Sequence, residues 1–150
     1  MFSTMPIRFI ILNIILMNIT NFINEKVDFV IDAIDTVGPK VSLIEFCIKN
    51  KVEIISSMGA GGRVDPSMIK YCDIWETKED GLARVVRQRL RKIGLRCKLP
   101  VVCSMELPKR YSIIELNEEN KRSSFGTLAT IPSIFGIYLA NYVIRKLTGI

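Results

Sequence analysis

The chain has 150 residues, enough for one domain with a real hydrophobic core. Apolar residues make up 49% and charged residues 24%, which fits a folded globular protein and excludes a largely disordered one. The formal net charge of +6 suits a polyanion such as nucleic acid, or an anionic membrane surface. The chain contains no histidine, which excludes histidine acid–base chemistry and imidazole-based metal sites.

The first 26 residues contain one short apolar run, Phe9–Met17, interrupted by Asn13. This run is too short to cross a bilayer, which takes about 20 apolar residues, and it lacks the charged front and cleavage site of a signal peptide. We interpret residues 1–26 as a strand remnant or an atypical N-terminal extension.

From Val27 onward, apolar strands alternate with amphipathic helices. The pattern predicts strands at 27–34, 52–58, 68–75 and 99–105 and helices at 39–50, 79–93 and 132–147. Residues 108–124 are typical of a polar, charged loop. Such alternation predicts an α/β fold in which helices flank a mostly parallel sheet.

The strand at 27–34 delivers a carboxylate, Asp35, at its carboxyl end, where open parallel sheets bind ligands. Carboxylate oxygen suits a magnesium ion that bridges nucleotide phosphates, and Lys40, one turn into the next helix, could point back to phosphate. The plainer alternative is that Asp35 only caps that helix. Asp32 lies among apolar strand residues and needs a hydrogen-bonding partner that the sequence does not identify.

A glycine-rich turn, Gly59-Ala-Gly-Gly-Arg63, follows the second predicted strand. No Gly-Lys-Ser/Thr follows it, so it matches neither a P-loop nor a dinucleotide fingerprint. We interpret it as a structural turn, because glycines permit positive φ and close approach of the backbone.

Residues 81–105 contain seven lysines or arginines and no acidic residue. Arg84, Arg87 and Arg91 recur along one face of the predicted helix, opposite its apolar stripe. Such a face is often merely solvated, but a single sign of charge over this length also suits contact with the phosphate backbone of a nucleic acid. No aromatic residue interleaves with these arginines, so the helix itself does not indicate base stacking.

The four cysteines include no Cys-x-x-Cys pair, so no zinc site is predicted. No secretory pattern accompanies them, and we expect reduced thiols in a cytoplasmic protein. Cys72 and Cys103 fall in apolar segments, and we expect both to be buried structural thiols.

The segment Ser123–Ile144 carries no charge. The helix expected after Pro132 is about 24 Å long, short for a membrane span. A buried core helix, hydrophobic all round, is the favoured interpretation, and membrane association through residues 126–147 is the alternative.

Several motifs stand in a fixed order along residues 27–150. They are Asp28-Phe-Val-Ile-Asp-Ala-Ile-Asp35, Gly59-Ala-Gly-Gly-Arg-Val-Asp-Pro66, Asp73-Ile-Trp-Glu-Thr-Lys-Glu-Asp80, Val101-Val-Cys-Ser-Met-Glu-Leu-Pro108 and Gly126-Thr-Leu-Ala-Thr-Ile-Pro-Ser-Ile-Phe-Gly136. Together they resemble the tRNA threonylcarbamoyladenosine dehydratases of the ThiF/MoeB, ubiquitin-activating-enzyme-like superfamily.

The resemblance implies an ATP-dependent cyclisation of threonylcarbamoyladenosine next to the tRNA anticodon. It implies ATP and magnesium as cofactors, tRNA as the partner and a homodimer as the assembly. With tRNA as the partner, the face of Arg84, Arg87 and Arg91 is the predicted tRNA contact, a role that comes from the charge argument and not from a family motif. Asp35 matches the aspartate that acts with magnesium and the ATP phosphates, and Lys40 matches the basic residue of the same motif. No single catalytic residue is assigned. The implied fold is a partial Rossmann-like, ThiF-type domain with a hydrophobic C-terminal helix.

The family's nucleotide-binding glycine loop lies before the part that these motifs cover, and residues 1–26 contain no glycine. Residues 27–150 are therefore interpreted as the C-terminal portion of the adenylating domain. The expected protein is a truncated form that is inactive alone, or one whose missing half is supplied elsewhere. Two alternatives remain open: an adenylyltransferase for a ubiquitin-like sulfur carrier, and a non-catalytic basic module for tRNA binding or dimerisation.

Overall fold

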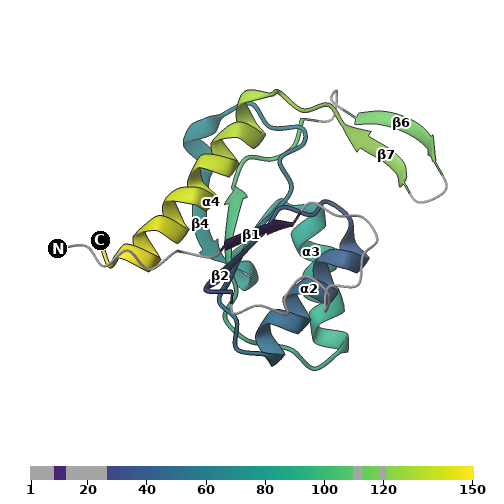
Figure 1. The fold of residues 1–150 in the computed structure, drawn as a ribbon. Coiled ribbons are helices and arrows are strands. Elements are labelled where there is room, and N and C mark those ends of the chain that lie inside the picture. The colour runs from purple at the N-terminus through teal and green to yellow at the C-terminus, as the bar shows by residue number, and fades with distance from the viewer. Residues whose placement is uncertain (1–8, 13–26, 110–112, 119–120) are drawn as a thin grey trace.

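A computed structural model describes residues 9–12, 27–109, 113–118 and 121–150 (Figure 1). A mixed five-stranded sheet forms its centre, with strand order β1-β2-β3-β5-β4. The strands are β1 (Phe9–Leu12), β2 (Phe29–Asp32), β3 (Ile54–Ser57), β4 (Ile69–Asp73) and β5 (Pro100–Ser104).

The direction of the strands defines two different edges of this sheet. β1, β2, β3 and β5 run parallel, so their carboxyl ends share one edge. β4 pairs antiparallel with β5, and Asp73 at its end lies opposite Pro100 at the start of β5. The predicted mostly parallel sheet is confirmed, and the antiparallel β4 closes one side of it.

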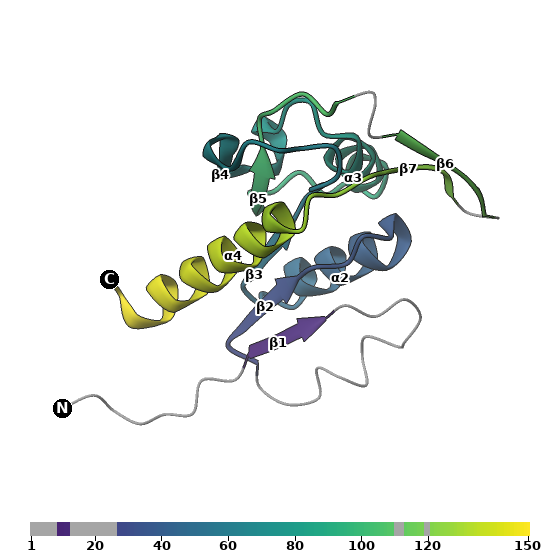
Figure 2. The same cartoon turned by 90° about the horizontal axis from the view of Figure 1, so that it is seen from above.

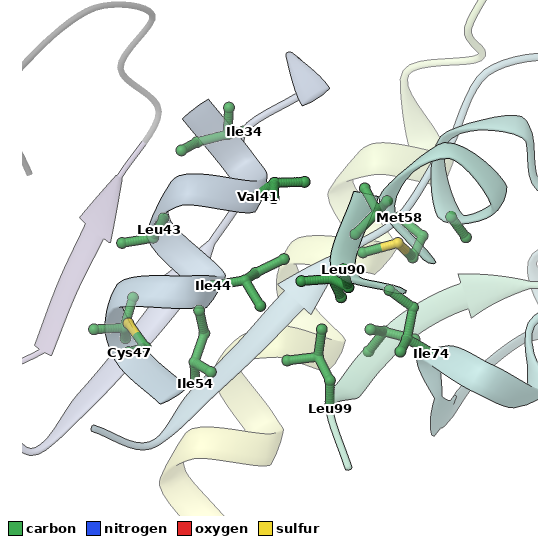
Figure 3. Close-up of a cluster of buried hydrophobic side chains, with 14 of the residues drawn as sticks. Ile34, Val41, Leu43, Ile44, Cys47, Ile54, Met58, Ile74, Leu90 and Leu99 are labelled. Carbon is green, nitrogen blue, oxygen red and sulfur yellow. The ribbon is translucent and has the colours of Figure 1, made fainter. Parts of the chain in front are cut away.

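Helices cover both faces of the sheet. α2 (Val37–Lys49) and α3 (Gly81–Lys92) lie on one face, and α4 (Thr130–Thr148) crosses the other (Figure 2). Ile44, Leu90 and Leu99 converge in the core under α2 and α3 (Figure 3). Two short 3₁₀ turns, η1 (Pro66–Met68) and η2 (Ile74–Glu76), flank β4.

Period-two alternation along the strands divides the core into two clusters. Val30 belongs to the cluster under α2 and α3, whereas its neighbours Phe29 and Ile31 pack against α4. In β3, Ile54 and Ile55 divide in the same way. The same parity therefore turns Asp32 and Ser56 toward α2.

α4 corrects the expectation of a helix that is hydrophobic all round and buried. One stripe at four-residue spacing packs on the sheet: Ile131, Phe135, Leu139 and Val143. On its other side Ile137 is 65% exposed and Ile144 is 55% exposed. None of the helices in the described ranges has the length and apolarity needed to cross a bilayer, so the alternative of a span at 126–147 gains no support.

The segment at 108–124 was expected to be a loop, and this prediction was wrong. β6 (Ile113–Glu118) and β7 (Lys121–Phe125) form an antiparallel hairpin, which projects from the rest of the fold in both views (Figures 1 and 2). A two-stranded hairpin needs no continuous apolar run, so the many polar residues concealed it.

β1 fits the strand that was one of the two interpretations of residues 1–26, whereas the start of α2 differs from expectation. β1 lies within residues 1–26 and pairs in parallel with β2; the rest of that segment lies outside the described residues. α2 begins at Val37, so Pro39 is its third residue rather than its first. The first-turn amides lack helical partners, and the first helical bond is donated by Lys40 N to Thr36 O at 3.1 Å, so Pro39 costs the helix no hydrogen bond.

Candidate functional site

Polar side chains gather at the edge where the parallel strands end. β2 ends at Asp32, β3 at Ser57 and β5 at Ser104, and the segments that follow carry Asp35 and Glu106. Ligands of open α/β sheets bind at this edge. It is therefore the first place to examine for a functional site.

A fully buried ion pair lies beneath this edge. Lys40 Nζ is 2.6 Å from Asp32 Oδ2, and both side chains are 0% exposed. The other two ammonium protons go to Ser56 Oγ at 3.0 Å and Ser57 O at 2.9 Å. Asp32 also accepts bonds from Ser56 Oγ and from Ile34 N, the latter at 2.9 Å. Every donor of the ammonium is satisfied, as a buried charge requires.

This pair identifies the partner that Asp32 needs. It also places Lys40 differently from the orientation toward phosphate that the sequence suggested, because its ammonium already has three protein acceptors and no exposure. Lys40 anchors the start of α2 to the ends of β2 and β3. A direct role for Lys40 at ATP stays a prediction.

Asp35 lies above the pair, in the short segment between β2 and α2, and it is exposed. The residue in the N-cap position of α2 is Thr36, whose side chain makes no capping bond. Two hydrogen bonds hold this segment, one on each side of Asp35. Ile34 N donates to Asp32 Oδ1, and Lys40 N donates to Thr36 O. The structure thus presents the Asp35 carboxylate from an anchored backbone at the carboxyl edge.

The glycine-rich loop after β3 is built around Arg63, which is 3% exposed. Its guanidinium donates to the carbonyl oxygens of Gly59 at 2.6 Å, Gly61 at 3.3 Å and Glu79 at 3.0 Å. Gly62 has a φ of 73°, a conformation that favours glycine. These bonds give the loop the role of a structural turn.

Two buried carboxylates pin this loop from either side. Asp80 Oδ2 accepts from Gly59 N at 2.9 Å and lies 3.7 Å from Arg63, while Oδ1 caps α3 at Ala83 N, 2.8 Å away. Glu106 Oε2 accepts from the amides of Val64 and Asp65, both at 2.9 Å.

Sequence reasoning did not single out Arg63, Asp80 or Glu106 as individual residues. Their positions within the quoted motifs were the available signal. An acid at the start of a predicted helix, as at Asp80, also indicates a cap.

The three arginines of α3 have different roles. Arg84 and Arg91 are exposed, but Arg87 is half-buried and donates to the carbonyl oxygens of Ile74 and Thr77, each at 3.2 Å. Arg87 therefore helps to hold the η2 turn. Arg84 and Arg87 also border a hollow of about 310 Å³ at the N-terminus of α3. The predicted tRNA contact for this helix stays a prediction.

All four cysteines are free thiols. Cys103 is buried as expected, whereas Cys72 is only half-buried, and their sulfur atoms are 2.8 Å apart. The hydrogen bond between them lowers the pKa of Cys72 and raises that of Cys103. Burial, helped by the charge of Asp32, raises the pKa of Cys47 to about 12. In the part of the chain described here, no three acidic or cysteine side chains are grouped to hold a metal ion.

Comparison with known proteins identifies the family of the chain. The sequence model of the ThiF family matches residues 3–150. The chain belongs to the ThiF family. The match begins earlier than the motifs at 27–150 and takes in β1.

Relatives within the ThiF family confirm the resemblance to the dehydratases. The chain is 33% identical over 134 residues to the tRNA threonylcarbamoyladenosine dehydratase of Bacillus subtilis, covering 84% of this chain and 53% of that protein. It is 34% identical over 142 residues to dehydratase 2 of Saccharomyces cerevisiae, covering 83% of this chain and 32% of that protein.

Solved structures agree with these sequence relatives. The Escherichia coli tRNA N6-threonylcarbamoyladenosine dehydratase TcdA matches with a TM-score of 0.75 and 29% identity, covering 87% of this chain and 52% of that one. A structure of the same enzyme in complex with ATP matches with a TM-score of 0.75 and 28% identity, covering 87% of this chain and 51% of that one. The chain thus spans about half the length of these bacterial relatives and about a third of the yeast one.

Proposed function

We propose that this chain acts in the ATP-dependent cyclisation of threonylcarbamoyladenosine in tRNA. Its ThiF-family relatives are tRNA threonylcarbamoyladenosine dehydratases. In the proposed reaction the substrate carboxylate is joined to AMP with release of pyrophosphate. Ring closure then expels AMP, so the tRNA loses one water in total.

One observation carries the proposal: Asp35 is exposed on an anchored segment at the carboxyl edge of the parallel strands. Magnesium is usually held by one or two carboxylates together with phosphate oxygens and water. A single exposed carboxylate therefore fits a Mg²⁺ ion that arrives with ATP. The buried pair of Asp32 and Lys40 fixes the backbone from which Asp35 projects.

Calorimetric titration of the chain with ATP and magnesium chloride tests this role of Asp35. We expect D35N to weaken binding by at least about tenfold, ~1.4 kcal/mol, because the amide keeps the shape but loses the charge that holds the metal. D28N is the matched control, since exposed Asp28 precedes the other end of β2. Equal affinities for the natural chain and D35N would contradict the assignment of Asp35.

A non-catalytic tRNA-binding module is the second candidate, favoured by the seven basic residues and no acid in 81–105. tRNA binding together with no measurable ATP binding would favour this candidate over the enzyme. The sulfur-carrier adenylyltransferase is less favoured, because the cysteines include no Cys-x-x-Cys pair. A homodimer also stays a prediction, for which the exposed apolar side chains Ile137 and Ile144 of α4 offer a surface.

A further inference from the structure

A second hollow, of about 700 Å³, lies away from the candidate nucleotide site. Asp73 and Pro100, which pair where β4 ends and β5 begins, both line it. Because β5 runs parallel to β2, the hollow lies at the opposite edge of the sheet from Asp35. Three aromatic residues, Tyr71, Trp75 and Tyr142, contribute to its walls.

Hydrogen bonds fix two of these rings, Trp75 and Tyr71, and the third, Tyr142, packs against Tyr71. Trp75 donates its indole N–H to Cys97 O at 2.8 Å. Tyr71 donates its hydroxyl to Tyr138 O at 2.7 Å, and its ring centroid is 5.5 Å from that of Tyr142. Rings held in this way lose little conformational freedom when a planar ligand packs against them.

The charged groups around the hollow favour an anion. Arg96 and Lys98 line it, and the guanidinium carbons of Arg91 and Arg96 lie 5.2 Å and 6.0 Å from the centre of the Trp75 ring. None of these three cations forms an ion pair within the described part of the chain.

The two acids in the lining, Asp73 and Glu76, are occupied instead. Asp73 accepts from the amides of Trp75 and Leu99, at 3.0 Å and 3.2 Å, and Glu76 accepts from Asp73 N at 3.2 Å. These bonds leave the charges of Asp73 and Glu76 in place, so they balance Arg96 and Lys98 within the lining. The positive excess comes from the neighbouring cations Arg91, Arg145 and Lys146, and it suits phosphate.

We propose that this hollow binds an unpaired stretch of RNA. Bases pack against the aromatic rings and the arginine planes, and phosphates contact Arg91, Arg96 and Lys98. Arg145 and Lys146, beside Tyr142 in an adjoining hollow of about 270 Å³, continue the basic surface. The inference rests on the proposed function, which makes tRNA the partner, and adds a contact site remote from the reacting edge.

α3 connects this site with the nucleotide edge. Its N-terminal residue follows Asp80, which bonds the loop after β3, and its last turn carries Arg91 beside Trp75. A helix of 12 residues is about 18 Å long at ~1.5 Å per residue. A bound RNA could therefore contact both Arg84 and the hollow, which explains the long basic stretch better than solvation alone.

Trp75 is the only tryptophan of the chain, so its fluorescence reports on this hollow alone. The full chain is titrated at low salt with tRNA and with a short single-stranded RNA. We expect saturable quenching by both, because a base packs against or next to the indole. The double variant R96Q/K98Q should weaken binding about tenfold and lower the slope of log K against log salt by about one to two. K49Q/K51Q, which removes two exposed lysines outside the hollow, should behave like the natural chain.

Three outcomes would overturn the proposal. If tRNA binds without quenching and R96Q/K98Q has no effect, RNA lies elsewhere and only this inference fails. If duplex RNA of equal length quenches as strongly as single-stranded RNA, the preference for unpaired bases is wrong. If no RNA binds, the hollow is not an RNA site. The titration of the natural chain and D35N with ATP then tests the proposed nucleotide site independently.

Discussion

At the scale of single residues, the pair of Asp32 and Lys40 determines how Asp35 is presented. Alternation along β2 and β3 turns Asp32 and Ser56 toward α2, and a helical side chain leans back toward the N-terminus of its helix. Lys40 therefore reaches the strand ends rather than the crevice. The sequence showed that Asp32 needs a partner, and it contains a lysine eight positions later. It did not supply the pairing, because the depth of burial at Lys40 depends on how α2 packs against the sheet.

We expect K40M to lower the free energy of unfolding by about 3–5 kcal/mol, since it leaves the Asp32 carboxylate buried without its countercharge. Replacing both partners, as in D32L/K40M, should cost less than K40M alone, because no unpaired charge remains. Urea denaturation of the natural chain and these variants measures both values. A loss below about 0.5 kcal/mol for K40M would show that the pair does not hold this segment.

At the scale of elements, α3 depends on one carboxylate. Asp80 caps its N-terminus through Ala83 N, fixes Gly59 and balances buried Arg63. D80A should therefore cost about 2–4 kcal/mol, more than the loss of a cap alone. D80N should cost less, since its side-chain oxygen can still accept the capping bond. Thermal unfolding compares the two; equal losses would mean that the charge on Asp80 contributes nothing.

The elements also show which parts of the fold a sequence pattern predicts. Strands β2 to β5 and helices α2, α3 and α4 were predicted to within a few residues, because each buries an apolar stripe with a clear period. The direction of β4 was not predicted, since periodicity carries no information about strand direction. The β6–β7 hairpin and the exposed side of α4 were also missed. The hairpin lacks a continuous apolar run, and apolar residues such as Ile137 and Ile144 resemble core residues in a pattern although they are exposed.

At the scale of the whole molecule, the two edges at which the parallel strands begin and end carry different kinds of side chain. The carboxyl edge presents Asp35 above a buried ion pair, and the opposite edge carries aromatic rings and cations that form no ion pair with any described residue. α3 runs between them with its basic face. The resemblance in the sequence identified the family and predicted a role for Asp35, whereas the hollow around Trp75 combines β4, β5 and α4 and becomes visible only in the folded chain.

The most direct measurement is the conversion of the modified nucleoside itself. tRNA carrying threonylcarbamoyladenosine is incubated with the chain, ATP and magnesium, digested to nucleosides and analysed by mass spectrometry. The account predicts a product lighter by one water, formed only with ATP, retained by D28N and lost in D35N. Full conversion by D35N would contradict it. An unchanged nucleoside mass with the natural chain at saturating ATP would contradict the proposal that the chain acts by itself and would favour the expected truncated form that is inactive alone.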